Sequence, residues 1–412
     1  MTTTAVPTDL QDERLRADTG LRGAARAAIG RVRDGDLGLL PVIAGLVIIW
    51  TIFQILNPVF LSPANLSNLL MESAPVGVIA LGIVFVLLVG EIDLSVGSVS
   101  GLASAILAVT YVKSGLPLAV GILLAIVTAA VIGWVYAQAY NRIGVPSFVI
   151  TLAGLLGFLG LQLYVLGPNG TINIPFTSPL VLLGQLLYVP VWLAYLLAAI
   201  AVAVFVVQRL GYARRRRAAG LSASATSVLA VQAIALAVVL FLAAFYLYQA
   251  SGVGWMFVFF IALVLIANYG LTKTSWGRNF FAVGGNREAA RRSGIHVGGV
   301  YAAAFITCST LAAVGGLLAA GRLSSAATSS GGGDVNLNAI AAAVIGGTSL
   351  FGGRGSAFAA LLGILVISSI SSGLTLLNLD SSIRYMVTGA VVFIAVGLDA
   401  LARRSRSSHG RA

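Results

Sequence analysis

The sequence predicts an all-α protein, a polytopic transmembrane bundle of about 10–12 helices with two pseudo-repeated halves and broken or re-entrant helices. Two observations predict this class. Of the 412 residues, 58% are hydrophobic and 9% are charged, whereas an ordinary soluble domain has roughly 25% charged residues. Apolar runs also recur along the chain, at lengths near the ~20 residues that a helix needs to cross a bilayer.

These apolar runs are expected to be helices, because backbone in lipid must satisfy its own hydrogen bonds. The second, third and tenth runs are short and are expected to be broken or re-entrant rather than full spans. In chain order the runs cover residues 39–56, 74–89, 96–112, 116–140, 146–166, 180–207, 227–249, 252–271, 300–320, 337–350, 356–377 and 383–401.

The positions of the arginines predict the orientation. When the chain is threaded from a cytosolic N-terminus, Arg142, Arg214–Arg217 and Arg354 reach the cytosolic side, as the positive-inside rule requires. Lys113 and Arg322 reach the opposite side. Both termini are therefore expected in the cytosol. Membrane topology explains the net charge of +12 without a nucleic-acid partner.

The chain is expected to form one transmembrane domain, residues 39–402, between cytosolic tails at residues 1–38 and 403–412. The first tail is basic and has no apolar core followed by a small-residue cleavage site, so it is not expected to be a signal peptide. The pieces between helices are short, which leaves no room for an external globular domain. They are the cytosolic loops 208–226 and 272–299 and the turn-rich external loops 167–179 and 321–336.

Several chemistries have no candidate residues. Neither Lys113 nor Lys273 ends a G-x-x-x-x-G-K-[ST] loop, so any ATP must be bound by another chain. The single cysteine, Cys308, excludes a disulfide framework, and His296 and His409 form no metal site with a nearby carboxylate. No nucleophile is paired with a base. The chain is therefore not expected to be an enzyme, and it has no candidate catalytic or metal-binding residues.

Two glycine-rich stretches resemble each other, VGEIDLSVGSVS at residues 89–100 and IGGTSLFGGRGS at residues 345–356. They predict a parallel internal repeat; chance similarity between glycine- and serine-rich membrane segments is the alternative. Glycine readily ends a helix, and a broken helix in a membrane must be buried in protein or line a cavity. The helix-break candidates are Gly90, Glu91, Asp93, Gly97, Gly346, Gly347 and Gly353.

The two carboxylates of the first stretch need a polar setting, because a charge at the bilayer centre costs ~2.5–3.5 kcal/mol or more. Glu91 and Asp93 are therefore expected at a helix break, near an interface or facing a polar cavity. We expect Asp93 to cap the following helix by accepting backbone N–H bonds. Direct contact of Glu91 with a substrate is the less favoured reading.

The cytosolic loop 272–299 is expected to contain a short helix. Asn286 can cap its start, Glu288 falls in its first turn, Arg291 and Arg292 fall in its last turn, and Gly294 stops it. This helix is expected to lie across the cytosolic face. The alternative is an ordinary solvated basic loop.

The spelling E288-A289-A290-x-x-x-G294 resembles the EAA loop with which importers of the ATP-binding cassette class dock their ATPase subunits. With three other stretches it is similar to the permease subunit of bacterial monosaccharide importers, the group of the ribose, galactose, arabinose and xylose permeases. Residues 214–232 and the ending AVGLDALARR resemble the xylose-type members. The stretches are IDLSVGS (92–98), VPSFVITLAGL (145–155), GRNFFAVGGNREAARRSGI (277–295) and AIAAAVIGGTSLFGGRGS (339–356).

This resemblance implies a multi-pass permease of the bacterial cytoplasmic membrane, in contact with lipid and working by alternating access. The implied partners are a second permease copy, an ATPase subunit with two cassettes that binds the ATP, and an extracytoplasmic sugar-binding protein; this chain itself is expected to hold no cofactor. Two departures concern Glu91, where many relatives have glycine, and Asn336, where many have an acid that could help receive the binding protein. Coupling is assigned to Asn286, Glu288, Ala289, Ala290, Arg291, Arg292 and Gly294.

The pathway of a neutral sugar needs hydrogen-bonding groups rather than a countercharge. The helix-break residues are assigned to it together with Ser95, Ser98, Thr348 and Ser349, although most serines in membrane helices are packing residues. Importers for nucleosides or branched-chain amino acids share related architecture and are the alternative. A secondary transporter driven by ions is less favoured, because only Glu72, Glu91 and Asp93 could supply intramembrane ionisable groups.

Overall fold

The computed structural model describes residue 23, residues 40–223, 225–332 and 334–380, and positions 382–383, 386–390, 393 and 397. The chain divides into two compact units. The larger comprises Leu39–Tyr188 and Val253–Ala412, and the smaller includes Val189–Gly252. Apart from the positions just named, the expected tails and the expected last helix, residues 383–401, lie outside the described residues.

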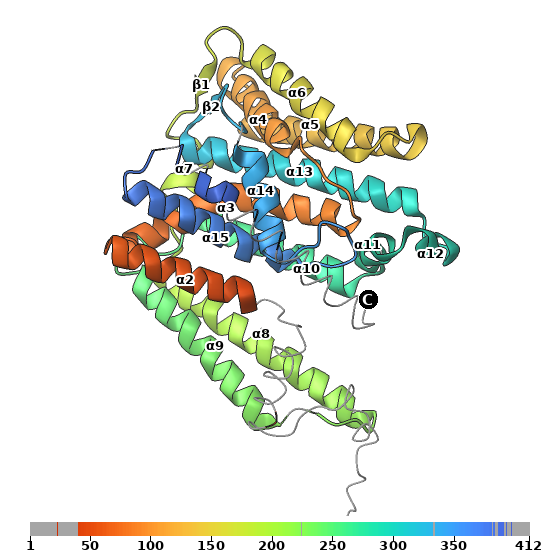
Figure 1. Ribbon diagram of the computed structural model, residues 1–412. Helices are drawn as coiled ribbons and strands as arrows, with labels where there is room; N and C mark the ends of the chain where they lie inside the picture. The colour runs from red at the N-terminus through yellow and green to blue at the C-terminus, as the bar shows by residue number, and fades with distance from the viewer. Residues whose placement is uncertain are drawn as a thin grey trace, which may run out of the picture. The chain divides into compact units, whose positions relative to one another are not determined.

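Two long helices form the centre of the larger unit, α3 (Pro63–Leu88) and α13 (Val297–Leu323), which lie side by side (Figure 1). Small residues bring their backbones together: a Cβ on Gly82 would lie 2.9 Å from the Cys308 carbonyl oxygen. Contacts of this kind are typical of helix pairs in membranes. Against this pair pack α4 (Val96–Ala108), α5 (Leu118–Gln138) and α15 (Ala357–Leu376).

The remaining elements of the larger unit include two π-helical turns and a two-stranded sheet. Across both units, nine helices of the described chain are long and apolar enough to cross a membrane. This confirms the predicted helical bundle. The further elements are α2 (Leu40–Leu56), η2 (Val109–Lys113), η3 (Ala139–Ile143), α6 (Ser147–Leu166), β1 (Thr171–Asn173), α7 (Pro179–Gln185), α10 (Trp255–Lys273), α11 (Ser275–Gly285), α12 (Arg287–Arg292), β2 (Ser325–Ala327) and α14 (Asp334–Ile345).

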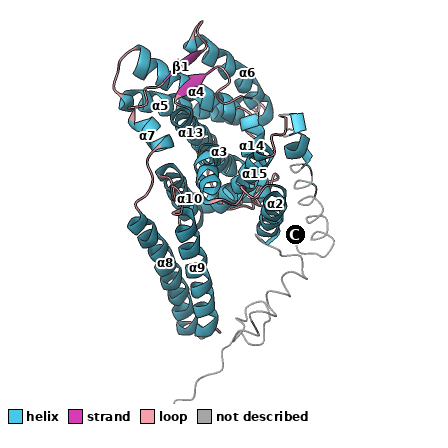
Figure 2. Ribbon diagram, turned by 90° about the vertical axis from the view of Figure 1, so that its left-hand side faces the viewer, coloured by secondary structure: helices cyan, strands magenta, loops and turns pink. Residues whose placement is uncertain are grey.

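The smaller unit is a hairpin of α8 (Val191–Ala218) and α9 (Thr226–Leu247), which lie side by side in Figure 2. The expected single helix over 180–207 is wrong, because the structure divides this run between α7 and α8. Pro190 stands at the N-cap of α8, and proline disfavours a helical residue before it and offers no N–H. The four arginines, Arg214–Arg217, fall in the last turns of α8.

Two of the short predicted runs have different outcomes. The run expected at 74–89 is part of α3, which has 26 residues and is a full-length candidate span. The helix begins earlier than hydropathy predicts, because its first half contains polar residues such as Asn68 and Glu72. The tenth run is short, as expected. Helix α14 has 12 residues, or roughly 18 Å at ~1.5 Å per residue, and it crosses the direction of α3 and α13 (Figure 1).

Loops that the threading places on the same side lie together. Strand β1 pairs antiparallel with β2 and so joins the two loops that were expected outside. At the other end of α13, the Asn141 amide donates to the Gly298 carbonyl at 2.9 Å, which joins two loops that were expected inside. We call these the strand end and the α12 end.

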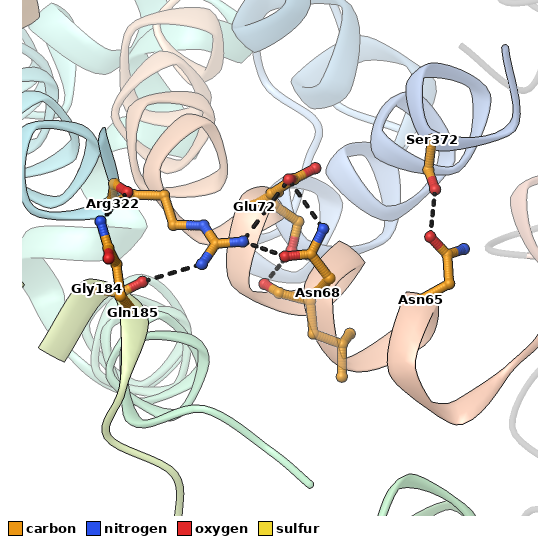
Figure 3. A network of polar contacts seen from close by, with 9 residues as sticks. Asn65, Asn68, Glu72, Gly184, Gln185, Arg322 and Ser372 are labelled. Carbon is orange, nitrogen blue, oxygen red and sulfur yellow. Dashed lines mark hydrogen bonds and ion pairs between the residues drawn. The ribbon is translucent and has the colours of Figure 1, made fainter. Parts of the chain in front are cut away.

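A polar network ties three helices together at the strand end (Figure 3). The Arg322 guanidinium contacts the Asn68 side-chain oxygen, lies 3.7 Å from a Glu72 carboxylate oxygen and donates to the Gly184 carbonyl at 3.4 Å. The Gln185 amide donates back to the Arg322 carbonyl at 2.8 Å. Arg322 therefore links α3, α7 and α13.

Candidate functional site at the α12 end

Helix α12 is built as its sequence predicts. The Asn286 side chain accepts the Ala289 N–H at 2.9 Å and caps the start. At the other end, Gly294 has a left-handed φ of 83° and donates to the Arg291 carbonyl, while Ile295 donates to the Ala290 carbonyl. This pair of bonds is a Schellman motif, which favours glycine at the left-handed position.

The residues of the predicted coupling motif divide between two faces of α12. Glu288, Ala289, Arg291 and Arg292 are exposed, whereas Ala290 is only 4% exposed. Glu288 and Arg292 lie 3.5 Å apart on the open face, and an exposed pair of this kind contributes little to stability. The exposed face is thus available to a partner, and Ala290 holds the helix to the bundle.

Helix α11 places α12 against the end of α3. Trp276 and Phe280 of α11 pack on the Phe85 ring, with centroids 5.7 Å and 5.6 Å away. One turn later, a Cβ on Gly284 would overlap the Leu88 carbonyl oxygen. Only glycine permits this backbone approach, so α11 and the end of α3 are in direct backbone contact.

The two glycine-rich stretches meet at this same place. The Gly353 N–H donates to the Leu88 carbonyl at 2.9 Å, and the backbone of Gly90 lies against Phe351 and Gly352. Gly90, Gly352 and Gly353 have φ values of 81°, 83° and 71°, which L-residues other than glycine rarely adopt. We call this contact of the α3 end, α11 and residues 349–355 the glycine junction.

The two glycine-rich stretches, residues 89–100 and 345–356, do not have the same backbone conformation at matching positions. Gly97 was expected to break a helix, but it is the second residue of α4, whereas its counterpart Gly353 has a left-handed φ. Gly346 directly follows α14 and packs against the Ala359 backbone, while Gly347 has a φ of 102°. The order helix, loop, helix recurs, but the second loop is longer.

Gly97 instead admits a neighbouring loop. A Cβ there would lie 2.5 Å from the Gly331 carbonyl oxygen, and the Gly97 N–H donates to the Asn336 side chain. Asn336 is 8% exposed, so it supports α4 here and is not an open contact for a binding protein. Just before Gly331 in the chain, the Ala327 and Ser330 carbonyls accept from the Gln162 amide, both at 2.9 Å.

Asp93 is buried beside the start of α4. Its Oδ1 accepts the Ser95 N–H at 2.8 Å and the Ser95 hydroxyl at 2.7 Å, and the Tyr136 hydroxyl donates to Ser95 Oγ at 2.8 Å. Asp93 therefore accepts a backbone N–H as expected, but from the N-cap residue and not from the first turn of α4. Cys308 of α13 faces the same carboxyl group.

Glu91 lies on the open side of this region. The Tyr140 hydroxyl donates to its Oε1 at 2.5 Å and accepts from Arg287 Nη1 at 3.4 Å. The Arg287 guanidinium also lies 5.3 Å from the Tyr301 ring centroid. A cavity of about 410 Å³ opens here, lined by Glu91, Tyr140, Asn141, Gly144, Pro146, Ser147, Phe148 and Arg287.

Tyr140, Asn141 and Arg287 were not predicted from the sequence as site residues. Their signal was the polar group Tyr140-Asn141-Arg142 directly after an apolar run, and the position of Arg287 next to Glu288. Hydropathy alone assigns both stretches to membrane-end positions. Only the folded chain brings them together with Glu91.

The predicted pathway hydroxyls are all buried. Ser95 and Ser98 donate to Asp93 and to the Leu155 carbonyl, and Ser349 accepts the Phe351 N–H at 3.2 Å. Thr348 Oγ1 is buried without a hydrogen-bond partner within the described chain. None of these four residues lines the cavity beside Glu91.

Comparison with known proteins identifies similar sequences over almost the whole chain. Residues 65–396 match the family model described as the permease component of branched-chain amino acid transport systems. The chain is 36% identical over 376 residues to the xylose transport system permease protein XylH of Escherichia coli K12, covering 90% of this chain and 93% of that protein.

Two further relatives have similar coverage. XylH of Haemophilus influenzae is 34% identical, with 90% of this chain and 98% of that protein covered. The ribose import permease protein RbsC of Bacillus subtilis is 33% identical, with 89% and 94% covered. No solved structure gives a significant match.

Proposed function

Because the chain belongs to the family described as the permease component of branched-chain amino acid transport systems, we propose that it is the membrane-spanning subunit of an ATP-driven, binding-protein-dependent importer. Its proposed solute is xylose or a related monosaccharide. The observation that carries this proposal is the 36% identity to a xylose permease over 90% of the chain. The chain moves solute and is not itself an enzyme.

The choice of solute rests on the curated relatives. They include the xylose and ribose permeases and a galactose/methyl galactoside permease, which is 30% identical. The family description favours a second candidate, a branched-chain amino acid; nucleosides are a further alternative. An ion-coupled transporter is disfavoured by the family.

We propose that an ATPase subunit with two cassettes docks on the exposed face of α12 and binds the ATP. The α12 end then faces the cytosol, with both termini, and the strand end faces an extracytoplasmic sugar-binding protein. A second copy of the chain completes the pathway. The support is the exposure of Glu288 and Ala289 and the absence of a nucleotide-binding loop from the sequence.

The proposed mechanism passes through the glycine junction. Closure of the cassettes on ATP moves α12 and, through α11, the end of α3 and residues 349–355. The bundle then shifts between two packings that open to opposite sides, which is a population shift driven by a partner. The helix-break residues and the hydroxyls of Ser95, Ser98, Thr348 and Ser349 are proposed to face the solute in one of these packings.

Uptake measurements test the solute. In a bacterial strain that lacks this chain, radiolabelled pentoses, hexoses and branched-chain amino acids are offered with and without the plasmid-borne chain. We expect restored uptake of xylose or a related monosaccharide, matching the specificity of the cognate binding protein. Restored uptake of leucine alone would make the second candidate correct.

A further inference from the structure

We propose that the cavity between Glu91 and Arg287 is a binding site for a neutral monosaccharide at the α12 end, separate from the buried hydroxyls of the proposed pathway. The inference rests on the proposed sugar importer. It follows from the chemistry of the lining, from the size of the cavity and from the two elements that the cavity joins.

The lining offers acceptors and donors whose charges balance. The Tyr140 hydroxyl forms a hydrogen bond with each charged group: it donates to Glu91 Oε1 and accepts from Arg287 Nη1. A carboxylate has two acceptor oxygens and a guanidinium has five N–H donors, so both groups can form further hydrogen bonds with a ligand. Because the charges of Glu91 and Arg287 offset each other, the lining offers no net charge that would favour an anion or a cation over a neutral ligand. A hydroxyl both donates and accepts, and a sugar carries several.

The other lining residues suit the rest of a sugar. Asn141 uses its amide nitrogen on the Gly298 carbonyl at 2.9 Å, which leaves an acceptor oxygen. Phe148 exposes 55% of its surface and gives an apolar wall for the C–H face of the ring. The volume of about 410 Å³ lies within the ~300–1,000 Å³ of small-molecule sites and suits a monosaccharide.

The cavity lies between the coupling helix and the bundle, so a sugar bound in it would affect the movement of α12. Arg287 is the first residue of α12, and Glu91 belongs to the link between α3 and α4. A sugar hydrogen-bonded to both would hold the coupling helix to that link. Solute that has accumulated on this side should therefore oppose movement of α12 and slow the ATPase cycle.

Saturation-transfer NMR on the purified full chain tests the binding. We expect xylose to bind to the native chain. Arg287→Ala and Glu91→Ala should each weaken its affinity about tenfold, because each removes a charged hydrogen-bonding partner. Arg142→Ala is the matched control, since Arg142 is exposed nearby and does not line the cavity. Equal binding in all four proteins, or stronger binding of xylose 5-phosphate than of xylose, would overturn the inference.

Cysteine protection localises the sugar even if those variants fold poorly. The one native cysteine, Cys308, is buried, so Asn141→Cys and Thr272→Cys each offer one exposed thiol. We expect xylose to slow maleimide labelling of Asn141→Cys and not of Thr272→Cys, which lies at the same end outside the cavity. No protection at position 141 with intact xylose uptake refutes the cavity site alone. Absent xylose uptake in the complete importer refutes the proposed function.

Discussion

At the residue scale, the two alanines of the α12 motif have opposite environments. Ala289 is exposed on the face that is proposed to meet the ATPase, while Ala290 is buried against the bundle. A sequence motif treats them as equivalent small residues. Their burial separates a docking role from a structural one.

Ala289→Arg should abolish co-purification of the ATPase and leave the chain folded, because the added side chain extends into solvent. Ala290→Arg should lower stability by about 3 kcal/mol or more, because it forces a large charged group into a packed site. Fluorescence-detected size-exclusion after heating measures the stability, and affinity pull-down measures the ATPase. Full co-purification with Ala289→Arg would count against docking at α12.

A second residue-scale prediction concerns Gly97, whose Cβ would meet the Gly331 backbone. Gly97→Ala should destabilise the chain by about 1–3 kcal/mol, as for overpacked cores. Gly157→Ala on α6 is the matched control, since nothing lies within 4 Å of its Cβ position, and it should be neutral or slightly stabilising. Equal melting temperatures for the two variants would show that the loop yields easily.

At the element scale, α11 is the part that joins the docking helix to the bundle. Its aromatic face packs on Phe85, and Gly284 brings its backbone against Leu88. The adjacent Gly285 has nothing within 4 Å of its Cβ position. These neighbouring glycines therefore distinguish transmission through the junction from general flexibility of α11.

Gly284→Ala should reduce sugar uptake at least tenfold while the ATPase still co-purifies, because α11 is displaced from α3 and α12 keeps its exposed face. Gly285→Ala should transport normally. Vesicle uptake and ATPase pull-down, measured on the same preparations, check both statements. Normal uptake by Gly284→Ala would remove the glycine junction from the coupling route.

At the scale of the whole molecule, local signals were predictable and long-range contacts were not. Runs of apolar residues predicted most helices, and the Asn286 cap and Gly294 stop predicted α12, because both depend on residues close in sequence. The cavity joins Tyr140 to Glu91 and to Arg287 across 49 and 147 residues. Hydropathy and glycine positions carry no information on such pairings, which is also why Gly97 was taken for a break.

A disulfide across the strands tests alternating access for the whole bundle. Thr171 and Ala327 are paired residues of β1 and β2, and the Cα separation of ~4.5–5.5 Å between opposite residues of an antiparallel pair suits a disulfide. Oxidation of Thr171→Cys/Ala327→Cys should block uptake, and reductant should restore it, because the bond would tie the strand that follows α6 to the strand that follows α13. The single-cysteine variants are the controls, and unchanged uptake after complete oxidation would mean that the two loops move together.

The loop between β2 and α14 has a consequence for how the protein is made. The carbonyls of Ala327, the last residue of β2, and of Ser330 in the loop accept hydrogen bonds from the Gln162 amide, and Gly331 packs against the backbone of α4. Lipid cannot replace these partners, and the segment is too polar to enter the bilayer unaided. During biosynthesis it can settle only after α4 and α6 are in place, so maturation of this loop should be a late, post-insertion step.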